Sequence, residues 1–517
     1  MKPQARSLST RAVNALGEAR GCLQNGDASQ AQKLCHEVLA EYPEQADAQF
    51  MLGLVDLQHG RAEAALQRLQ AALSAAPDNL DAQAALGSAL FALSRPAEAA
   101  SAYAAVLERA PDAIDVRAHF AVALQQSGAV EQAIEQYRIA LAARPNDAYL
   151  HFNLGTAHKR LHEFDAAVDA YRRADALAPN DVSVVVALAT ALLERGLMAD
   201  AADAFQRVVA LDASDAESWC SLGYTRIRSG NAQGAADAAR EFGRRSDPGS
   251  GADDLLSNAL LSGGDSDGAL EICNRTIARS PANIQSHADR SIALAAKGLR
   301  DEARQVVDFD RFLQVSQIAV PAGFDDIEAF NSALLEHLRA HPDLRFDFSS
   351  ISCHNGQTSG EILIEPKGPV AELESILIRA GEDYRQRLGN AAHPWLQGAP
   401  QRTELSAWCT VLRSQGYQHG HIHPTSWLSG VYYLRLPRRR ADAAERESPD
   451  RAGWIEFGRT PEHYPAGDQG EIRYVDPKPG TLVLFPSFVY HRTVAFDSDD
   501  ERATIAFDFR PPGFYEN

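Results

Sequence analysis

Three histidines and one arginine near the C-terminal end of the chain have the residue types and spacing that metal chemistry needs. His421 and His423 are separated by one residue, and His491 follows about seventy residues later. Because alternate residues of a β-strand point to the same face, a strand through residues 421–423 would direct two imidazoles toward one ion. His491 can add a third nitrogen from a neighbouring strand. The pattern therefore predicts a metal site.

Arg502 adds a second kind of chemistry to this candidate site. It lies eleven residues after His491, in RATIAFDF, and a hairpin path of that length can return its side chain to the same interior. A guanidinium group binds a carboxylate through two parallel hydrogen bonds. The sequence thus predicts a metal ion and a dicarboxylate co-substrate in one site.

The elements that must position these residues begin near Glu404, where short runs rich in β-branched and aromatic residues alternate with Gly, Pro and charged turns. The runs are LSAWCTVL, LSGVYYLRL, GWIEF, EIRYV, GTLVLFP, VYHRTVAF and ATIAFDF. Many short strands of this kind predict a sandwich or a barrel. Two helices, one starting near Asp325 and one across residues 370–389, are expected to buttress the sheet.

Motifs in this region resemble those of the 2-oxoglutarate- and iron(II)-dependent oxygenase superfamily, over roughly residues 340–515. The resemblance rests on HIHPTSWLSGVYYL, on PGTLVLFPS followed by a histidine, and on RATIAF. It implies a double-stranded β-helix, which is a jelly-roll or cupin-like barrel. It also implies that Fe(II) and O2 take part, and that the reaction is a hydroxylation. The residues that the resemblance assigns are His421, His423 and His491 to the metal, and Arg502 and Tyr433 to 2-oxoglutarate.

His423 departs from the family's pattern, because it stands where the carboxylate of a 2-His-1-carboxylate triad is expected. His423 can itself be the third ligand, or a carboxylate from elsewhere, such as Asp476, can complete the set. A third possibility is that His419 and His421 form the first motif. We favour His423, because Pro424 and the SGVYY strand fix the alignment. A three-histidine site is also typical of cupin-type dioxygenases that use no 2-oxoglutarate, and these are the alternative enzyme class.

The region before residue 315 has a 34-residue period, which two columns of small or helix-ending residues reveal. Prolines occupy positions 43, 77, 111, 145 and 179, and alanines occupy 31, 65, 99, 133, 167, 201, 235, 269 and 303. Each unit would be a helical hairpin in which small residues allow close packing and proline ends the second helix. The columns resemble those of the tetratricopeptide-repeat family over roughly residues 10–310.

These boundaries predict a multidomain α plus β chain. An all-α tetratricopeptide-repeat solenoid of about nine units is expected over residues 10–314, with decay of the pattern after residue 201 and an irregular repeat or hinge at 246–267. The oxygenase-like domain would cover 315–517, with its core at 404–511. Since such solenoids present surfaces to partners, we expect a protein or peptide substrate. A non-enzymatic scaffold with a degenerate barrel is the alternative.

Composition narrows the possible partners. The formal net charge of −19 and the pI near 5.3 argue against nucleic-acid binding, which depends on clustered cations. The sequence contains no apolar run of membrane-spanning length. Six scattered cysteines without a C-x-x-C pair favour a reducing cytoplasm. The charged insert at 435–451 is expected to be a solvated hairpin loop beside the barrel mouth.

Overall fold

The computed structural model describes residues 8–247, 249–344, 346–347, 353–389, 392–437, 451–465, 470–498 and 500–513. Most of the charged insert at 435–451 lies outside the described residues. The chain divides into two compact units, Met1–Ala213 and Ser214–Asn517. No helix among the described residues is long and apolar enough to cross a membrane.

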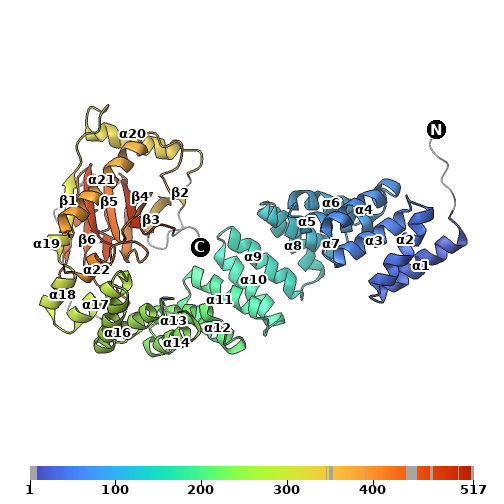
Figure 1. Cartoon of the computed structure of the whole chain (residues 1–517), viewed down its shortest axis with the longest axis horizontal. Helices are drawn as coiled ribbons and strands as arrows, with labels where there is room; N and C mark the ends of the chain where they lie inside the picture. The colour runs from blue at the N-terminus through green and yellow to red at the C-terminus, as the bar shows by residue number, and fades with distance from the viewer. Residues whose placement is uncertain are drawn as a thin grey trace. The chain divides into compact units, whose positions relative to one another are not determined.

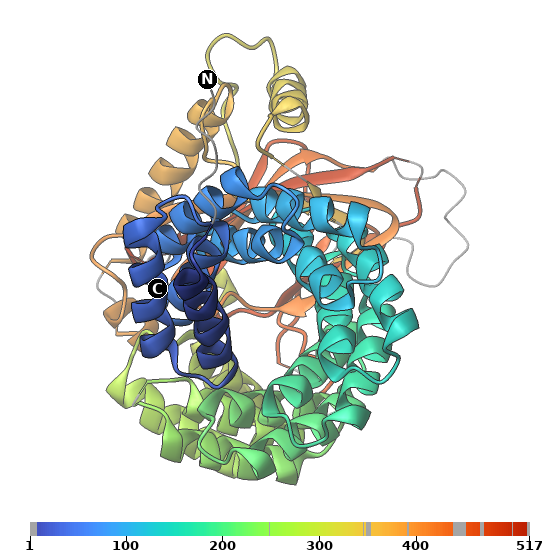
Figure 2. The same ribbon diagram turned by 90° about the vertical axis from the view of Figure 1, so that its right-hand side faces the viewer.

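The first unit consists of helices that follow one another in pairs (Figures 1 and 2). They are α1 (Thr10–Gln24), α2 (Ala28–Glu41), α3 (Ala46–Gln58), α4 (Ala62–Ala75), α5 (Leu80–Ala92), α6 (Pro96–Arg109), α7 (Ile114–Gln126), α8 (Val130–Ala143), α9 (Ala148–Arg160), α10 (Phe164–Leu177), α11 (Val182–Arg195) and α12 (Met198–Leu211). Each alanine of the 34-residue column in this unit lies in the second helix of a pair and is fully buried.

Glycines of the first helix in a pair allow the close approach of the second. A Cβ atom at Gly87 would lie 2.6 Å from the ring of Tyr103, and one at Gly155 would lie 2.8 Å from the ring of Tyr171. Both tyrosines are buried, so their rings have little room to move. The small residues of the repeat thus set the distance between paired helices.

The second unit begins with three more helix pairs, α13 (Ala216–Arg228) with α14 (Ala232–Arg245), α15 (Ala252–Ser262) with α16 (Ser266–Arg279), and α17 (Ile284–Ala296) with α18 (Arg300–Val306). The connection between α14 and α15 ends at Gly251, whose φ of 87° is a left-handed conformation that glycine adopts without strain. The stretch 246–267, where the sequence predicts a hinge or an irregular repeat, thus contains this connection, all of α15 and the start of α16.

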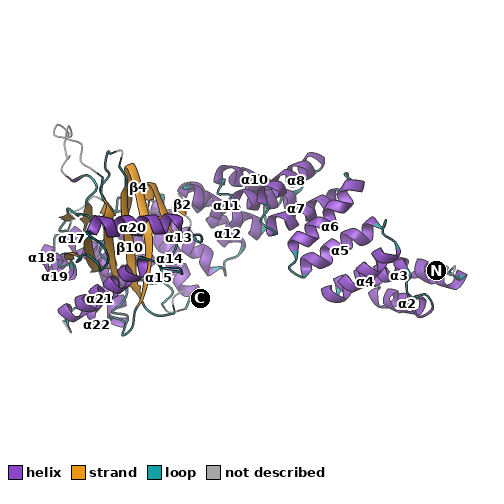
Figure 3. Cartoon of the chain, turned by 90° about the horizontal axis from the view of Figure 1, so that it is seen from above, coloured by secondary structure: helices purple, strands orange, loops and turns teal. Residues whose placement is uncertain are grey.

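The strands and remaining helices of the second unit follow α19 (Phe309–Phe312). They are β1 (Gln314–Gln317), α20 (Ile327–Ala340), β2 (Phe346–Asp347), β3 (Cys353–Ser359), α21 (Val370–Leu388), α22 (Pro394–Gln397), β4 (Glu404–His421), β5 (Leu428–Arg435), β6 (Ile455–Phe457), β7 (Arg473–Val475), β8 (Thr481–Pro486), β9 (His491–Thr493) and β10 (Arg502–Arg510). The two buttressing helices predicted near Asp325 and over 370–389 are confirmed as α20 and α21. Figure 3 shows them beside the strands.

All strand pairs are antiparallel, and the strand order along the sheet is β1-β8-β5-β10-β4-β9-β6-β7. Strand β4 belongs to both halves of the sheet. Its first part pairs with β10, with Leu412 opposite Arg502, and its last part pairs with β9, with His421 opposite His491. The predicted fold class, an all-α repeat solenoid followed by a double-stranded β-helix of the jelly-roll type, is confirmed, and the antiparallel sheet forms a half-barrel. The sequence run that we expected to end at Leu412 continues to His421.

The helix pair α17 and α18 shares one hydrophobic core with the barrel. This core runs from Ile284 in α17 through Phe309 and Phe312 in α19 to the strands. The ring of Phe312 lies 5.5 Å from that of Trp395, and the ring of Phe309 lies 6.4 Å from that of Phe457. In addition, the phenol of Tyr464 donates a hydrogen bond to Asn258 of α15. The last repeats are therefore packed as part of the barrel.

Two buried histidines at this junction predict acid sensitivity. His287 and His393 stack with ring centroids 5.6 Å apart, and burial lowers the pKa of each to about 4 from an ordinary 6.5. The unfolded chain therefore binds more protons than the folded chain between pH 6.5 and 4, so stability is complete above this window and falls as the pH drops through it.

The pH dependence can be assigned to one side chain with a conservative substitution. His393 Nδ1 accepts the backbone N–H of Trp395, and asparagine can fill the same capping role without titrating. We expect urea unfolding, followed by tryptophan fluorescence, to show a smaller loss of stability between pH 7 and 5 in His393→Asn than in wild type. The difference should approach about 1.4 kcal/mol per pH unit. Identical pH slopes would contradict the assignment.

Candidate metal centre and adjoining pocket

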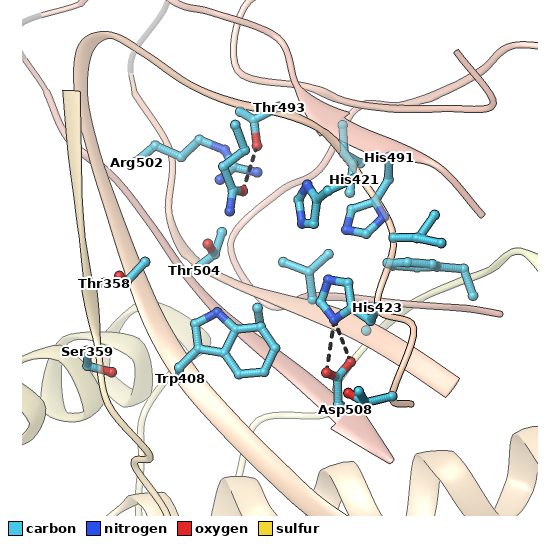
Figure 4. A pocket seen from close by; sticks show the side chains of 18 of the residues that line it. Thr358, Ser359, Trp408, His421, His423, His491, Thr493, Arg502, Thr504 and Asp508 are labelled. Carbon is cyan, nitrogen blue, oxygen red and sulfur yellow. Dashed lines mark hydrogen bonds and ion pairs between the residues drawn. The ribbon is translucent and has the colours of Figure 1, made fainter. Parts of the chain in front are cut away.

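The structure brings His421, His423 and His491 together at one end of the barrel (Figure 4). One nitrogen from each lies within 4.8 Å of the other two. His421 is the last residue of β4 and His491 is the first residue of β9, and their ring centroids are 4.3 Å apart. We predicted that one strand would carry His421 and His423. Instead β4 ends at His421, and the backbone N–H of His423 donates to Ser487 O, which holds this residue beside the others.

Hydrogen bonds to Nδ1 direct the same nitrogen of each ring toward the centre. Nδ1 of His421 donates to the carbonyl of His419 at 2.7 Å, and Nδ1 of His491 donates to the carbonyl of Val489 at 3.1 Å. A carbonyl oxygen only accepts, so the proton is on Nδ1 and the lone pair is on Nε2. Nδ1 of His423 is bound by both carboxylate oxygens of Asp508, at 2.8 and 2.9 Å. Three Nε2 atoms therefore remain for a metal ion.

Burial keeps two of these rings neutral. It lowers the pKa of His421 to about 4, with a further contribution from the nearby His423, and it lowers that of His491 well below 6.5. Metal ions bind unprotonated imidazole, so neither ring must lose a proton at neutral pH before it can coordinate. A set of three imidazole nitrogens suits Fe(II) and other first-row ions.

Asp508 is a site residue that the sequence reasoning missed. It is only 2% exposed, and besides His423 it accepts a hydrogen bond from Ser429 Oγ at 2.7 Å. Burial alone would raise the pKa of this carboxyl, but His423 and the serine hydroxyls outweigh it, so the pKa is lowered. The signal was present, because Asp508 lies an even number of residues after Arg502 on one strand and so points to the same face.

The two other assignments of the third ligand are not supported by the arrangement of the described side chains. Asp476 is an exposed residue after β7 and lies outside the histidine cluster. His419 is also exposed and outside the cluster, although its carbonyl oxygen accepts the hydrogen bond from His421. Among the described residues, the favoured set of His421, His423 and His491 is therefore the one that can hold an ion.

A cavity of about 380 Å³ joins the three histidines to Arg502. Arg502 is buried, and its Nε donates to the carbonyl of Gly453 at 3.2 Å. Thr493 and Thr504 line the cavity close to it, and Trp408 forms part of the wall and stacks on His423 (Figure 4). A guanidinium group binds a carboxylate through two parallel hydrogen bonds. Because Arg502 and the three histidines line the same cavity, its lining suits a carboxylate-bearing molecule.

The predicted co-substrate contact of Tyr433 stays a prediction. The ring of Tyr433 packs against Arg502, whose guanidinium carbon lies 5.1 Å from the ring centroid. Tyr433 is completely buried and is not among the residues that line the cavity. Burial raises its pKa to about 12, so the phenol stays protonated at neutral pH. Tyr432 points to the opposite face, where its hydroxyl donates to Asn331 of α20.

Three solved structures of repeat proteins are similar to part of the chain. MamA from Desulfovibrio magneticus RS-1 is 18% identical, with 34% of this chain and 99% of that chain covered and a TM-score of 0.32. A tetratricopeptide repeat protein from Parabacteroides merdae is 14% identical, with 49% and 100% covered and a TM-score of 0.36. YrrB, described as a TPR protein with an unusual peptide-binding site, is 20% identical, with 34% and 91% covered and a TM-score of 0.32. No curated protein matches the sequence.

Family models match both regions of the chain. Models described as tetratricopeptide or TPR repeats match residues 23–89, 121–162, 148–181 and 186–250. Residues 406–508 match the model described as "Putative 2OG-Fe(II) oxygenase", and this match contains the three histidines, Arg502 and Asp508. That family implies Fe(II), 2-oxoglutarate and O2. The chain therefore carries tetratricopeptide repeats and, after them, a domain of the 2OG-Fe(II) oxygenase family described by that model.

Proposed function

We propose that this protein is an Fe(II)- and 2-oxoglutarate-dependent dioxygenase that hydroxylates a protein or peptide substrate recruited by the repeats. One observation carries the proposal: three histidine nitrogens converge on one side of a cavity whose wall also contains the buried guanidinium of Arg502. The site thus combines metal ligands with a cation for the distal carboxylate of 2-oxoglutarate. The cytoplasmic location predicted from the cysteines is part of this proposal.

The side chains of the barrel divide the work. His421, His423 and His491 would hold Fe(II), and Arg502 would bind and orient the co-substrate with the hydroxyl groups of Thr493 and Thr504 nearby. Iron(II), 2-oxoglutarate and O2 together supply hydroxylation of a C–H bond, with one oxygen atom entering the substrate and the other entering succinate as CO2 is lost. Trp408, Val431 and Phe485 form the apolar part of the wall of the same cavity.

The repeats support a macromolecular substrate. Tetratricopeptide repeats generally bind proteins or peptides, and here the last of them share a core with the barrel. A substrate bound to these helices would be held at a fixed distance from the site, which favours reaction of one side chain over others.

The proposal is tested by anaerobic titration of the full chain with Fe(II) and 2-oxoglutarate. We expect wild type to develop the visible charge-transfer band of the chelated co-substrate, and His423→Ala to show none. Arg502→Ala should need at least about thirtyfold more 2-oxoglutarate, since breaking a buried ionic contact costs about 2 kcal/mol or more. Arg435→Ala is the matched control, because this arginine of the same barrel pairs with Glu501 at the surface. Absence of the band in wild type would refute the proposal.

The three-histidine set itself favours a second candidate, a cupin-type dioxygenase without 2-oxoglutarate. In that case Fe(II) would bind, but oxygen consumption would not depend on 2-oxoglutarate and no succinate would form. A degenerate barrel in a scaffold protein would bind neither Fe(II) nor 2-oxoglutarate. The same titration, followed by a succinate assay, separates the three.

A further inference from the structure

The three candidate ligands differ in the group that the Nδ1 atom of each ring contacts. His421 and His491 each donate from Nδ1 to a backbone carbonyl, which is neutral. His423 instead faces the carboxylate of Asp508, and both oxygens lie within 2.9 Å of Nδ1. Among the described residues of the cluster, only His423 therefore has an anionic partner.

The position of the Asp508 carboxylate is fixed by its strand and by its hydrogen bonds. Asp508 lies on β10, the strand that also carries Arg502, and the two side chains point to the same face because six residues separate them. A carboxylate at 2% exposure is costly unless it is hydrogen-bonded and paired. Ser429 donates to one oxygen at 2.7 Å and Arg510 approaches the other at 3.3 Å, so the charge is satisfied where it lies. These contacts also prevent the carboxylate from turning away from His423.

We infer that Asp508 is the positioning residue of this metal centre and supplies the negative charge that a carboxylate ligand supplies in a 2-His-1-carboxylate triad. His423 occupies the place of that ligand, so the negative charge of Asp508 lies one imidazole ring away from the ion. The hydrogen bond fixes Nε2 of His423 toward the metal and makes this nitrogen a stronger donor than the other two. The inference rests on the proposed metal site, but it concerns a residue that does not touch the ion.

Cobalt(II) binding by the full chain tests the inference without any need for activity. Co(II) is a visible and paramagnetic substitute for Fe(II), and its affinity is read from the absorption of the bound ion. Asp508→Asn keeps an acceptor for Nδ1 but removes the charge, and Asp508→Ala removes both. We expect Asn to weaken Co(II) binding about tenfold and Ala about a hundredfold, the range found when partners of metal ligands are removed.

Glu456→Gln is the matched control. Glu456 is a carboxylate of the same barrel, 1% exposed, and its ion pairs are with Arg459 and Arg492 and not with a candidate ligand. Its loss should leave Co(II) affinity within about twofold of wild type. Circular dichroism of each metal-free variant verifies that the barrel is folded.

Proton NMR of the cobalt protein adds a measurement that would not change selectively if Asp508 had only a structural role. Each ligand imidazole carries an exchangeable Nδ1 proton, and the nearby paramagnetic ion shifts it far outside the ordinary range. We expect Asp508→Asn to move one of these three signals strongly and to leave the other two in place. Wild-type affinity in Asp508→Ala, or equal movement of all three signals in Asp508→Asn, would overturn the inference. Failure of wild type to bind Co(II) would instead refute the proposed metal site.

Discussion

His491→Ala, made in the full chain, should bind Fe(II) more than about a hundredfold more weakly than wild type, which exceeds the loss expected from removing a hydrogen bond to a ligand. The reason is geometric. His421 and His491 face each other across paired strands, with ring centroids 4.3 Å apart, so removing one leaves two nitrogens that cannot enclose the ion. Formation of succinate from 2-oxoglutarate should fall to background in the same variant.

His419→Ala is the control for this prediction. His419 belongs to the same HGHIH segment, yet its ring lies outside the cluster and only its carbonyl contributes, through the hydrogen bond to His421. Alanine keeps that carbonyl, so iron affinity and succinate formation should match wild type. Isothermal titration calorimetry under anaerobic conditions measures the Fe(II) affinity of both variants. Equal losses in the two would show that the ligand set is wrong.

A fragment covering residues 315–517 should fail to fold, whereas a fragment covering 214–517 should fold cooperatively. The shorter fragment lacks α17 and the aromatic residues Phe309 and Phe312, which are buried against the barrel. Burying each large apolar side chain contributes about 1.5–3 kcal/mol. Losing Ile284, Leu294, Val306 and the two phenylalanines thus approaches the whole stability of a typical domain, about 5–15 kcal/mol.

Amide proton–nitrogen NMR spectra of the two fragments provide the measurement. The longer fragment should give dispersed signals and a single unfolding transition, and the shorter one should aggregate or bind a dye for exposed apolar surface. A dispersed spectrum from residues 315–517 would show that the shared core is dispensable. The result also decides where the oxygenase part can be cut for study.

The repeats were accessible to sequence reasoning because their packing is local. The glycines of the repeat lie against the following helices and the alanines of the 34-residue column are buried, so a fixed 34-residue step records this packing directly. The candidate metal ligands were accessible for a different reason. Histidines are chemically distinctive, and the spacing of His421, His423 and His491 stands out in any strand-rich region.

Other features depend on long-range pairing and leave little trace in the chain. The segment of β4 through Gln415, which has a φ of 60°, and Gly416 interrupts the alternation of apolar residues, so the sequence pattern indicates a strand only as far as Leu412. Pairing with β3 and β9 keeps this segment in a β-strand. The shared core is equally hidden, because Phe312 meets Trp395 across more than eighty residues. Asp508 was overlooked because a single acidic residue in a strand has many explanations.

The length of β4 has a consequence for how this site can change. One continuous strand sets both the position of Arg502, through its partner Leu412, and that of His491, through its partner His421. A slip of one residue in a strand turns every side chain to the other face. An insertion or deletion of one residue between Leu412 and His421 would therefore leave each pairing intact but would direct Arg502 and the candidate metal ligands to different faces. The number of residues in β4 between these two pairings therefore fixes the relative orientation of Arg502 and His491, and the positive φ of Gln415 lies within that interval.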